Sequence, residues 1–478
     1  KEKNTLRQTI FIAFCALSEA KGMDINMKII GIIAEYNPFH NGHAYQLAML
    51  RKKTDADYIA VAMSGNFVQR GEPAIIDKYA RTEMALQSGA DLVLELPVLW
   101  AASSAEAFAT AGVTLFEKMG CVEGICFGAE TDNLPLLTTI ADILADEPDN
   151  YRRLLSCYLK EGMSFPSARA QALCEIFKAA ALPDTGSNSS ETAVETLSDI
   201  LGSPNNILAI EYLKALKRLH SSMKPILLKR VGAEYHDTEI TAVKNNSIKK
   251  AEAIPTASAT AIRNLLFSKN VAVPPEKPAT PDSALLSDAL QSSMPDSALR
   301  ILTDYLKSSP VVSAGDFSSL LGYRLLTQDK SSISHIGDIT PEIANRLYNN
   351  RYQYLSFSQF CQLNKSREVT YTRISRILLH LILQITEDTY TLGHSLDYIP
   401  YLRILGFRKN SSALLSVLKS SAGIPMVSKL TDASVLLSPE AEILLEKDLF
   451  AANLYEQTKA IKSQTPSRSE YSREIVRL

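Results

Sequence analysis

Short apolar runs alternate with amphipathic stretches through the first part of the chain. The runs are rich in Ile, Val and Leu, as is typical of strands buried on both faces of a sheet, and comprise residues 28–34, 57–63, 91–96 and 122–127. The stretches between them have helical spacing and comprise residues 44–53, 79–89 and 101–119. This alternation predicts βαβ units, and therefore the α/β class with a Rossmann-like, doubly wound parallel sheet.

Three polar loops follow the predicted strands at one edge of this sheet. They are rich in Gly, Asn, Ser and charged residues, and they comprise residues 35–43, 64–78 and 128–133. In open parallel sheets, ligands bind beyond the carboxyl ends of the strands. We therefore expect the functional site at this edge.

The second part of the chain has a different pattern. Helical spacing dominates from residue 134, and residues 224–231 predict a last strand of the sheet. Five prolines between residues 268 and 298 indicate a linker or an insertion. From about residue 299 the pattern is helical almost throughout. We expect an α/β domain over 27–268, a linker or insertion over 269–298 and a mainly α-helical region over 299–478.

Composition narrows the class of protein. The chain has 478 residues, 46% of them hydrophobic and 21% charged, which excludes disordered, collagen-like and small disulfide-stabilised proteins. A length of this size corresponds to about three domains. Lys and Arg number 50 and Asp and Glu number 52. Because the net charge is close to zero, any nucleic-acid partner must be bound by a local basic patch.

Cysteine usage and hydropathy indicate the compartment. None of the six cysteines forms a Cys-x-x-Cys pair, and the histidines are not at zinc-ligand spacing, so we expect no structural metal. Such cysteines are typical of reduced cores in cytoplasmic proteins. No apolar run is long enough to span a membrane.

The basic and apolar start of the chain resembles a weak secretory signal, but the strand pattern begins after Met27, so we expect residues 1–26 to be a leader or extension outside the fold.

The first loop carries a specific chemical motif, His40-Asn41-Gly42-His43. A helix that starts here points free N–H groups at an anion, and Gly42 lets the backbone approach a phosphate closely. Imidazoles three residues apart on a first helical turn face the same way. As donors, His40 and His43 can stabilise charge that develops on a phosphorus centre during displacement. The alternative is that one or both histidines merely cap the helix or pack in the loop.

An ordered set of motifs resembles the bacterial tRNA(Met) cytidine acetate ligases, within the His-x-Gly-His nucleotidyltransferase superfamily. The motifs are residues 31–43, 63–73, 89–97, 127–130, 203–208 and 257–263. The resemblance implies an ATP-dependent ligase that joins acetate to ATP as acetyl-adenylate. It implies transfer of the acetyl group to the wobble cytidine of elongator tRNA(Met), giving 4-acetylcytidine with release of AMP and diphosphate. Mg²⁺ is expected to accompany ATP.

The resemblance also implies a set of functional residues. His40 and His43 would be catalytic, and residues 27–268 would form the ATP-binding catalytic domain. The ATP loop would comprise Ile33, Ala34, Glu35, Tyr36, Asn37, Pro38, Phe39, His40, Asn41, Gly42, His43, Ala44, Tyr45 and Gln46. Further nucleotide contacts would be Gly128, Asn205 or Asn206 (with Asn206 preferred), Arg230, Ser258, Thr260 and Arg263. Hydroxyl groups at a helix start, with an Arg, suit the outer phosphates. The alternatives are a surface Arg at 230 and an ordinary capped helix after Ser258.

Two further segments are candidate substrate contacts. The second loop, 64–78, is expected to line the acetate and cytidine end of the cleft through Gln69, Arg70, Glu72, Asp77 and Lys78, unless it is only a solvated loop. In the helical region, basic residues surround Tyr371 within 365–376, and Arg403, Arg408 and Lys409 follow. Basic residues among aromatics suit phosphates and a stacked base, so we expect tRNA contact here, although a solvated helix face is the alternative.

Two other functions remain open from the residues. A small-molecule adenylyl- or cytidylyltransferase would use the same His-x-Gly-His turn, but it would not need the large helical C-terminal half. An RNA-binding protein on a degenerate nucleotidyltransferase scaffold would not need the intact His pair, Gly42 and the Ser-x-Thr-x-x-Arg segment. No Cys or Ser is placed as an evident nucleophile, so no covalent acyl-enzyme is expected.

Overall fold

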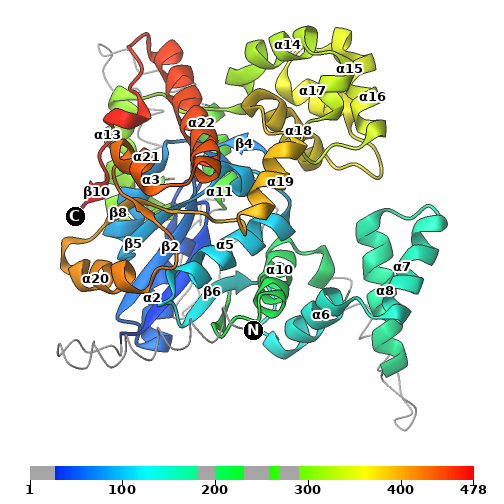
Figure 1. Cartoon of the computed structure of the whole chain (residues 1–478), viewed down its shortest axis with the longest axis horizontal. Coiled ribbons are helices and arrows are strands. Elements are labelled where there is room, and N and C mark those ends of the chain that lie inside the picture. Colours follow the sequence, from blue (N-terminus) through cyan, green and yellow to red (C-terminus); the bar gives the residue numbers. More distant parts are fainter. Residues whose placement is uncertain (1–26, 181–196, 198–199, 231–257, 269–289) are drawn as a thin grey trace, which may run out of the picture.

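The computed structural model describes residues 27–180, 197, 200–230, 258–268 and 290–478. The expected leader, 1–26, and most of the proline-rich segment 269–298 lie outside the described residues. Figure 1 shows a central sheet flanked by helices, with a group of short helices from α14 (Ser318–Thr327) to α18 (Tyr371–Leu383) to one side. No helix among the described residues has the length and apolar character that a membrane span requires.

The central sheet is mostly parallel. Its strands are β1 (Ile29–Ala34), β2 (Tyr58–Ser64), β5 (Leu92–Leu96), β6 (Gly124–Ala129), β7 (Lys224–Lys229), β8 (Leu402–Phe407), β9 (Met426–Val427) and β10 (Val476–Arg477). The order is β10-β8-β5-β2-β1-β6-β7, with β9 paired to β8. All pairs are parallel except β5 with β8. A separate antiparallel hairpin joins β3 (Phe67–Val68) and β4 (Glu72–Pro73). The predicted α/β class is confirmed.

Helices cover both faces of the sheet. The first part of the chain forms α2 (Asn41–Thr54), α3 (Lys78–Gln87), α4 (Val98–Ala101), α5 (Ala105–Met119), α6 (Leu134–Asp146), α7 (Asp149–Lys160), α8 (Phe165–Ala180), α10 (Pro204–Arg218), α11 (Ala259–Ser268) and α13 (Asp296–Ser308). The second part adds α14, α15 (Lys330–Ser334), α16 (Pro341–Asn350), α17 (Phe357–Asn364), α18, α19 (Glu387–Ser395), α20 (Ser412–Ser421), α21 (Ala433–Leu436) and α22 (Pro439–Ser463). The 3-10 turns are η1 (Ala314–Phe317), η2 (Arg351–Gln353), η3 (Lys409–Ser411), η4 (Leu430–Asp432) and η5 (Glu470–Ser472).

Two apolar clusters form the core, one on each face of the sheet. Ala60 of β2 packs with α5 and α10, whereas its neighbour Val61 packs with α2 and α3. This alternation follows from the period of two in a strand, and it explains why the strands carry so few charges. Most described cysteines lie in or against these clusters, but Cys157 is exposed, so the expectation of a core cysteine is wrong there.

The C-terminal part is mainly helical, as expected, but the strands β8, β9 and β10 interrupt its helices. Strand β8 pairs with β5 in antiparallel fashion, and β10 pairs with β8, so β7 is not the last strand of the sheet. The reason is the full burial of β5, whose outer backbone groups need hydrogen-bond partners. The predicted helix 101–119 is also interrupted, because the Ser104 side chain caps α5 by accepting from Ala107 N.

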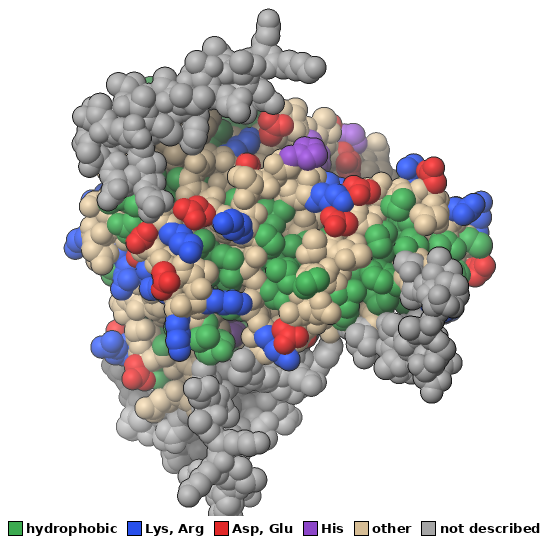
Figure 2. Space-filling view, turned by 90° about the horizontal axis from the view of Figure 1, so that it is seen from below, with side chains coloured by type: hydrophobic (Ala, Val, Ile, Leu, Met, Phe, Trp, Pro, Cys, Tyr) green, Lys and Arg blue, Asp and Glu red, His purple; other side chains and the backbone are tan. Residues whose placement is uncertain are grey.

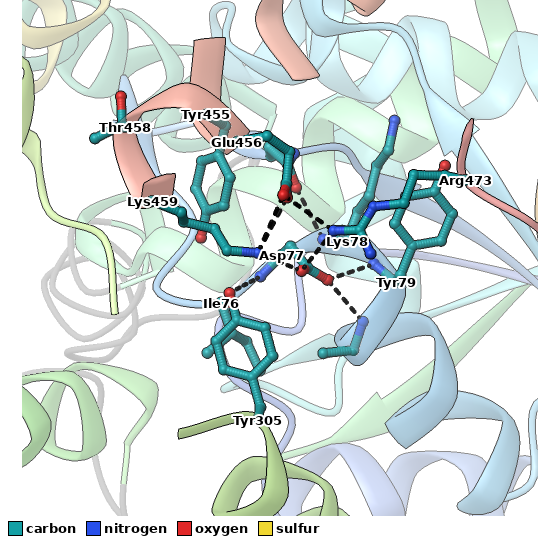
Figure 3. A network of polar contacts seen from close by, with 12 residues as sticks. Ile76, Asp77, Lys78, Tyr79, Tyr305, Tyr455, Glu456, Thr458, Lys459 and Arg473 are labelled. Carbon is teal, nitrogen blue, oxygen red and sulfur yellow. Dashed lines mark hydrogen bonds and ion pairs between the residues drawn. The ribbon is translucent and has the colours of Figure 1, made fainter. Parts of the chain in front are cut away.

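A buried network of charges joins the start of α3 to the end of the chain (Figure 3). Asp77 accepts a hydrogen bond from Lys459 Nζ at 2.8 Å and lies 3.6 Å from the Arg473 guanidinium. Lys78 Nζ lies 2.8 Å from Glu95 and 2.6 Å from Glu470. Asp77 and Lys78 therefore bind the C-terminal segment and do not line the cleft as expected.

The same network includes Arg403 of β8. Its guanidinium lies 3.6 Å from Glu470, and its side chain is 3% exposed. The expectation that Arg403 contacts tRNA is therefore wrong, because a group this buried is not accessible to RNA. The position of the basic residue within a strand of the central sheet explains the difference.

Replacing Lys78 with Met should destabilise the protein by about 3–5 kcal/mol, because the Glu95 and Glu470 carboxylates would stay buried without their cation. Urea unfolding followed by circular dichroism measures the loss. The matched control is Lys307→Met, since Lys307 is 69% exposed in its pair with Asp304 and should change stability by less than about 1 kcal/mol. Equal effects of the two substitutions would contradict a special role for the buried pair.

Candidate active site

A cavity of about 390 Å³ opens at the carboxyl edge of the parallel strands. The β1–α2 loop, the β3–β4 hairpin, the ends of β6 and β7, and the starts of α10 and α11 form its wall. The predicted residues that line it are Ile33, Ala34, Glu35, Tyr36, Asn37, His40, Gly42, His43, Tyr45, Gln46, Gly128, Asn205, Arg230, Ser258, Thr260 and Arg263. The cavity lies at the location predicted for the site. Its wall is formed by segments more than 200 residues apart in the sequence.

The two histidines form a stacked pair at the start of α2. Their ring centroids lie 3.7 Å apart. His40 Nδ1 accepts a hydrogen bond from Gly42 N at 3.0 Å, and His43 Nδ1 accepts one from His40 N at 3.2 Å. Both imidazoles thus cap the helix through one nitrogen. Since each Nδ1 is an acceptor, a neutral ring must carry its proton on Nε2.

The surroundings keep both rings neutral. Burial, followed by the nearby Arg230 and Arg263 guanidinium groups, lowers the pKa of His40 to about 3. Burial, followed by His40 and Arg230, lowers the pKa of His43 well below its ordinary value. The two histidines can therefore cap the helix and still offer a donor to a ligand. The capping hydrogen bonds occupy Nδ1 of each ring, and each Nε2–H can donate.

Aromatic side chains and a glycine fix the position of the pair. The Tyr36 ring meets the His43 ring edge-on, with centroids 4.8 Å apart, and the buried Phe39 ring lies 5.5 Å away. A Cβ at Gly42 would lie 2.9 Å from His40 Cε1. Any larger residue at 42 would therefore displace the His40 ring, which adds a packing reason to the predicted role of this glycine.

A hydrogen-bonded group lies across the cavity at the start of α10. Asn205 Nδ2 donates to Glu130 Oε1 at 2.6 Å, and Arg230 Nη1 donates to Asn205 Oδ1 at 3.4 Å. Asn206 is buried behind them, and its side-chain oxygen accepts from the backbone N–H groups of Glu130 and Thr131. Asn205 therefore faces the cavity, and Asn206 supports the loop. A Cβ at Gly128 would lie 3.3 Å from Arg230 Cγ, so this glycine makes room for the Arg side chain.

The start of α11 closes another side of the cavity. Arg263 Nη1 donates to Asn37 O at 2.8 Å, and its Nη2 donates to Thr260 Oγ1 at 3.1 Å. Ser258 Oγ caps the helix by accepting from Ala261 N at 3.1 Å. The predicted Ser-x-Thr-x-x-Arg group is thus assembled next to the histidine loop, with the Arg bound to that loop.

Five of the predicted ATP contacts do not line the cavity. Phe39 is fully buried in the core, and Ala44 packs against it. Asn41 turns away and donates to Ser292 O at 2.9 Å. Pro38 and Asn206 lie behind the wall. The structure gives these residues supporting positions because consecutive residues of a loop cannot all face one ligand.

Arg81 is a residue that the sequence analysis missed. Its side chain is fully buried, and its guanidinium donates to the Glu35 carbonyl at 2.6 Å and the Ser64 carbonyl at 3.1 Å. It also donates to the carbonyls of Gly65 and Ile76. The Arg81 guanidinium therefore connects the histidine loop to the second loop by hydrogen bonds to the backbone of both. The sequence signal is weak, because an Arg in a helix is usually exposed.

The family model described as HIGH Nucleotidyl Transferase matches residues 27–470. The tRNA(Met) cytidine acetate ligase of Thermoanaerobacter sp. (strain X514) is 37% identical over 453 residues, covering 95% of this chain and 100% of that relative. The protein of the same name from Clostridium perfringens (strain SM101 / Type A) is 36% identical over 430 residues, covering 90% and 95%. The chain belongs to this family of HIGH nucleotidyl transferases. The resemblance inferred from the ordered motifs is confirmed.

Solved structures give the same result for the fold. Thermotoga maritima TmcAL in its apo form I matches with a TM-score of 0.81 at 29% identity, covering 95% of this chain and 100% of that one. The same protein bound with alpha-thio ATP matches with a TM-score of 0.79 at 28% identity and the same coverage. The predicted fold, a nucleotidyltransferase sheet followed by a mainly helical region, is confirmed at the level of the whole chain.

The neutral state of the histidines predicts a titration result. Both rings should stay neutral, with the proton on Nε2, between pH 5 and pH 8, because the pKa of His40 is about 3 and that of His43 is also lowered. Nitrogen-15 NMR of labelled histidine, assigned with single His→Gln variants, measures this. A ring that titrates near pH 6.5 would contradict it. The unfolded chain binds protons below about pH 6.5 that the folded rings do not, so acidification through that range should also lower stability.

Proposed function

We propose that this protein is an ATP-dependent ligase that acetylates the wobble cytidine of elongator tRNA(Met). The observation that carries the proposal is the pair of neutral imidazoles facing a cavity lined by Arg230 and Arg263. Such a cavity suits a triphosphate, and the related TmcAL was solved with alpha-thio ATP. The expected action in the cytoplasm, on tRNA and free acetate, belongs to the same proposal.

In the first step, an acetate oxygen attacks the α-phosphorus of ATP, and the bond from that phosphorus to the bridging oxygen of diphosphate breaks. Acetyl-adenylate forms and diphosphate leaves. The Nε2–H groups of His40 and His43 donate to the α-phosphate oxygens as negative charge develops there. Because these donors are fixed by their capping bonds, they need no reorganisation during the reaction.

Different residues of the cavity wall would contact the two ends of the nucleotide. Ser258, Thr260 and Arg263 would bind the outer phosphates, since two hydroxyls and a guanidinium meet there. Gly128, Asn205 and Arg230 would contact the adenosine. We prefer Asn205 to Asn206 for this contact, because Asn205 lines the cavity and the Asn206 side chain is occupied by backbone N–H groups.

In the second step, the cytidine amine attacks the acetyl carbonyl, the bond to the AMP oxygen breaks, and the amine loses a proton. The β3–β4 hairpin would form this end of the site, because Gln69, Arg70 and Glu72 line the cavity. Arg70 would hold the acetate carboxylate through its positive charge. The activated anhydride is needed because an aromatic amine is a weak nucleophile.

Mg²⁺ would enter with the triphosphate. In the described parts of the chain, no group of three or more His, Cys, Asp or Glu side chains is placed to hold a metal ion. Binding through phosphate oxygens with few protein ligands is usual for Mg²⁺. The ion would neutralise the departing diphosphate, and the residues of the chain would position acetate and the α-phosphate.

Incubation with ATP, labelled acetate and total tRNA should give 4-acetylcytidine together with AMP and diphosphate. The His43→Ala variant should lose about 100-fold or more in rate, because one transition-state donor is removed, while it still binds tRNA. Mass spectrometry of digested tRNA and a filter-binding assay measure the two quantities.

The same assay separates the alternatives. Equal labelling of tRNA without ATP would contradict the proposal. Transfer of AMP to a small molecule without any tRNA product would indicate the small-molecule nucleotidyltransferase. Binding of tRNA with no role for ATP would indicate an RNA-binding protein on this scaffold.

Arg81 should act as a positioning residue for the first step. In Arg81→Lys, one ammonium nitrogen with three N–H groups cannot replace the four contacts that the three guanidinium nitrogens make to Glu35, Ser64, Gly65 and Ile76, so we expect at least about a tenfold loss of kcat in acetate-dependent ATP–diphosphate exchange. The matched control is Arg51→Lys, since Arg51 donates to the carbonyls of Ala56, Asp57 and Gly89 at the opposite edge of the sheet. A similar loss of kcat in both variants would contradict positioning and indicate a general loss of stability.

A further inference from the structure

The basic residues expected to contact tRNA are partly engaged within the protein. Arg373 and Arg376 of α18 both pair with Asp338, at 3.3 and 3.4 Å, and the Arg376 side chain is only 11% exposed. Arg403 is buried in β8, within the central sheet. Figure 2 shows acidic and basic side chains interspersed over one face of the molecule, so a surface that binds RNA must be local.

A stack of three planar groups lies nearby in the sequence, at the end of α16 and in the turn η2 that follows it. The Arg351 guanidinium carbon lies 3.7 Å from the centre of the Tyr348 ring and 4.3 Å from that of the Tyr352 ring. The Tyr352 side chain at the outer end of the stack is 76% exposed. Among the described residues, no acidic side chain forms an ion pair with Arg351. The stack therefore presents a flat cationic and aromatic surface to solvent.

Two exposed cations follow α17 in the chain, and the end of α17 meets the end of α16. Asn350 Nδ2 donates to Asn364 Oδ1 at 3.0 Å, so the ends of α16 and α17 meet. Arg351 directly follows Asn350, and Lys365 directly follows Asn364. Lys365 and Arg367 are exposed, and neither is ion-paired within the described part of the chain. Residues 341–370 contain four cations and two carboxylates, which gives this surface a local positive charge.

Helix α18 connects this surface to the cavity. Ser375 Oγ donates to Gly71 O at 2.9 Å, and Gly71 lies between Arg70 and Glu72 of the cavity wall. Gly71 has φ +75°, and a Cβ there would overlap the backbone of Arg376, so the hairpin and α18 pack backbone to backbone. The chain from Arg367 to Ser375 spans at most about 20 Å, or roughly six stacked bases.

We propose that Tyr348, Arg351, Tyr352, Lys365 and Arg367 bind unpaired nucleotides of the tRNA that flank the acetylated cytidine. This inference rests on the proposed function. A base would stack on the exposed Tyr352 ring, whose other face is backed by Arg351, and the two flexible cations would contact phosphates. The span of at most about 20 Å from Arg367 to Ser375, which contacts the hairpin of the cavity wall, suits a single-stranded loop that places one base in the site and its neighbours on this surface.

Filter binding of tRNA, measured over a range of KCl concentrations, tests the proposal. Tyr352→Ala and Arg351→Ala should each raise the Kd about tenfold, whereas Tyr352→Phe keeps the stacking face, loses only the exposed hydrogen bond from Arg351 Nη2, and should stay within about twofold of the wild-type Kd. The double variant Lys365→Ala/Arg367→Ala should lower the slope of log Kd against log salt by about 1.4, as expected for two phosphate contacts on a single strand. Acetate-dependent ATP–diphosphate exchange without tRNA should stay within about twofold of wild type for all of them.

Controls and contrary outcomes separate this inference from the proposed function. Tyr471→Ala and Lys307→Ala are exposed matched controls elsewhere on the molecule and should bind tRNA normally. Unchanged tRNA affinity in the Tyr352 and Arg351 variants would overturn the inference, as would equal losses of exchange and binding. A change in oligomeric mass by light scattering without a change in tRNA affinity would identify a protein contact and overturn it. If wild-type protein shows no acetate-dependent exchange, the proposed function itself fails.

Discussion

One helical turn at the start of α3 carries three buried charged residues, and the site depends on them. Asp77 binds Lys459 of α22, Lys78 binds Glu95 of β5 and Glu470 of η5, and Arg81 binds the carbonyls of the two loops at the site. Burying charges is costly, and apolar residues of similar shape often give equal or greater stability. What the charges provide is position, because each is bound to a different part of the chain. The histidine loop, the second loop and the C-terminal segment are therefore all bonded to the same helical turn.

The histidine loop shows how folding and chemistry use the same bonds. Helix α2 needs acceptors for its first N–H groups, and the two Nδ1 atoms supply them. This capping determines the tautomer, so the donors that face the cavity are fixed before any ligand is bound. Burial and the adjacent guanidinium groups keep the rings neutral. A protonated ring would lose its cap, so the stability of the helix and the donor state depend on one protonation state.

Local motifs could be predicted from the sequence, and distant pairings could not. The alternation of apolar runs was sufficient to predict the strands β1, β2, β5 and β6. The His40-to-His43 segment was sufficient to predict a candidate site at the ends of these strands. Strand β8 was missed because a six-residue run in a helical background pairs with β5, which lies about 300 residues earlier. Arg81 was missed for a related reason. Its partners are backbone carbonyls of other loops, and no periodicity in its own segment indicates burial.

The near-zero net charge can be understood in the same terms. Many of the basic residues are used inside the protein, as Lys78, Arg81 and Arg403 are, or are paired on its surface, as Arg373 and Arg376 are with Asp338. Total charge therefore says little about RNA binding. What matters is which cations have no carboxylate partner and lie near aromatic side chains on elements that pack against the site. Because α18 packs directly on the Gly71 hairpin, nucleotides bound beyond α18 would be held in a fixed relation to the cavity, and specificity for one base in a loop requires such a relation.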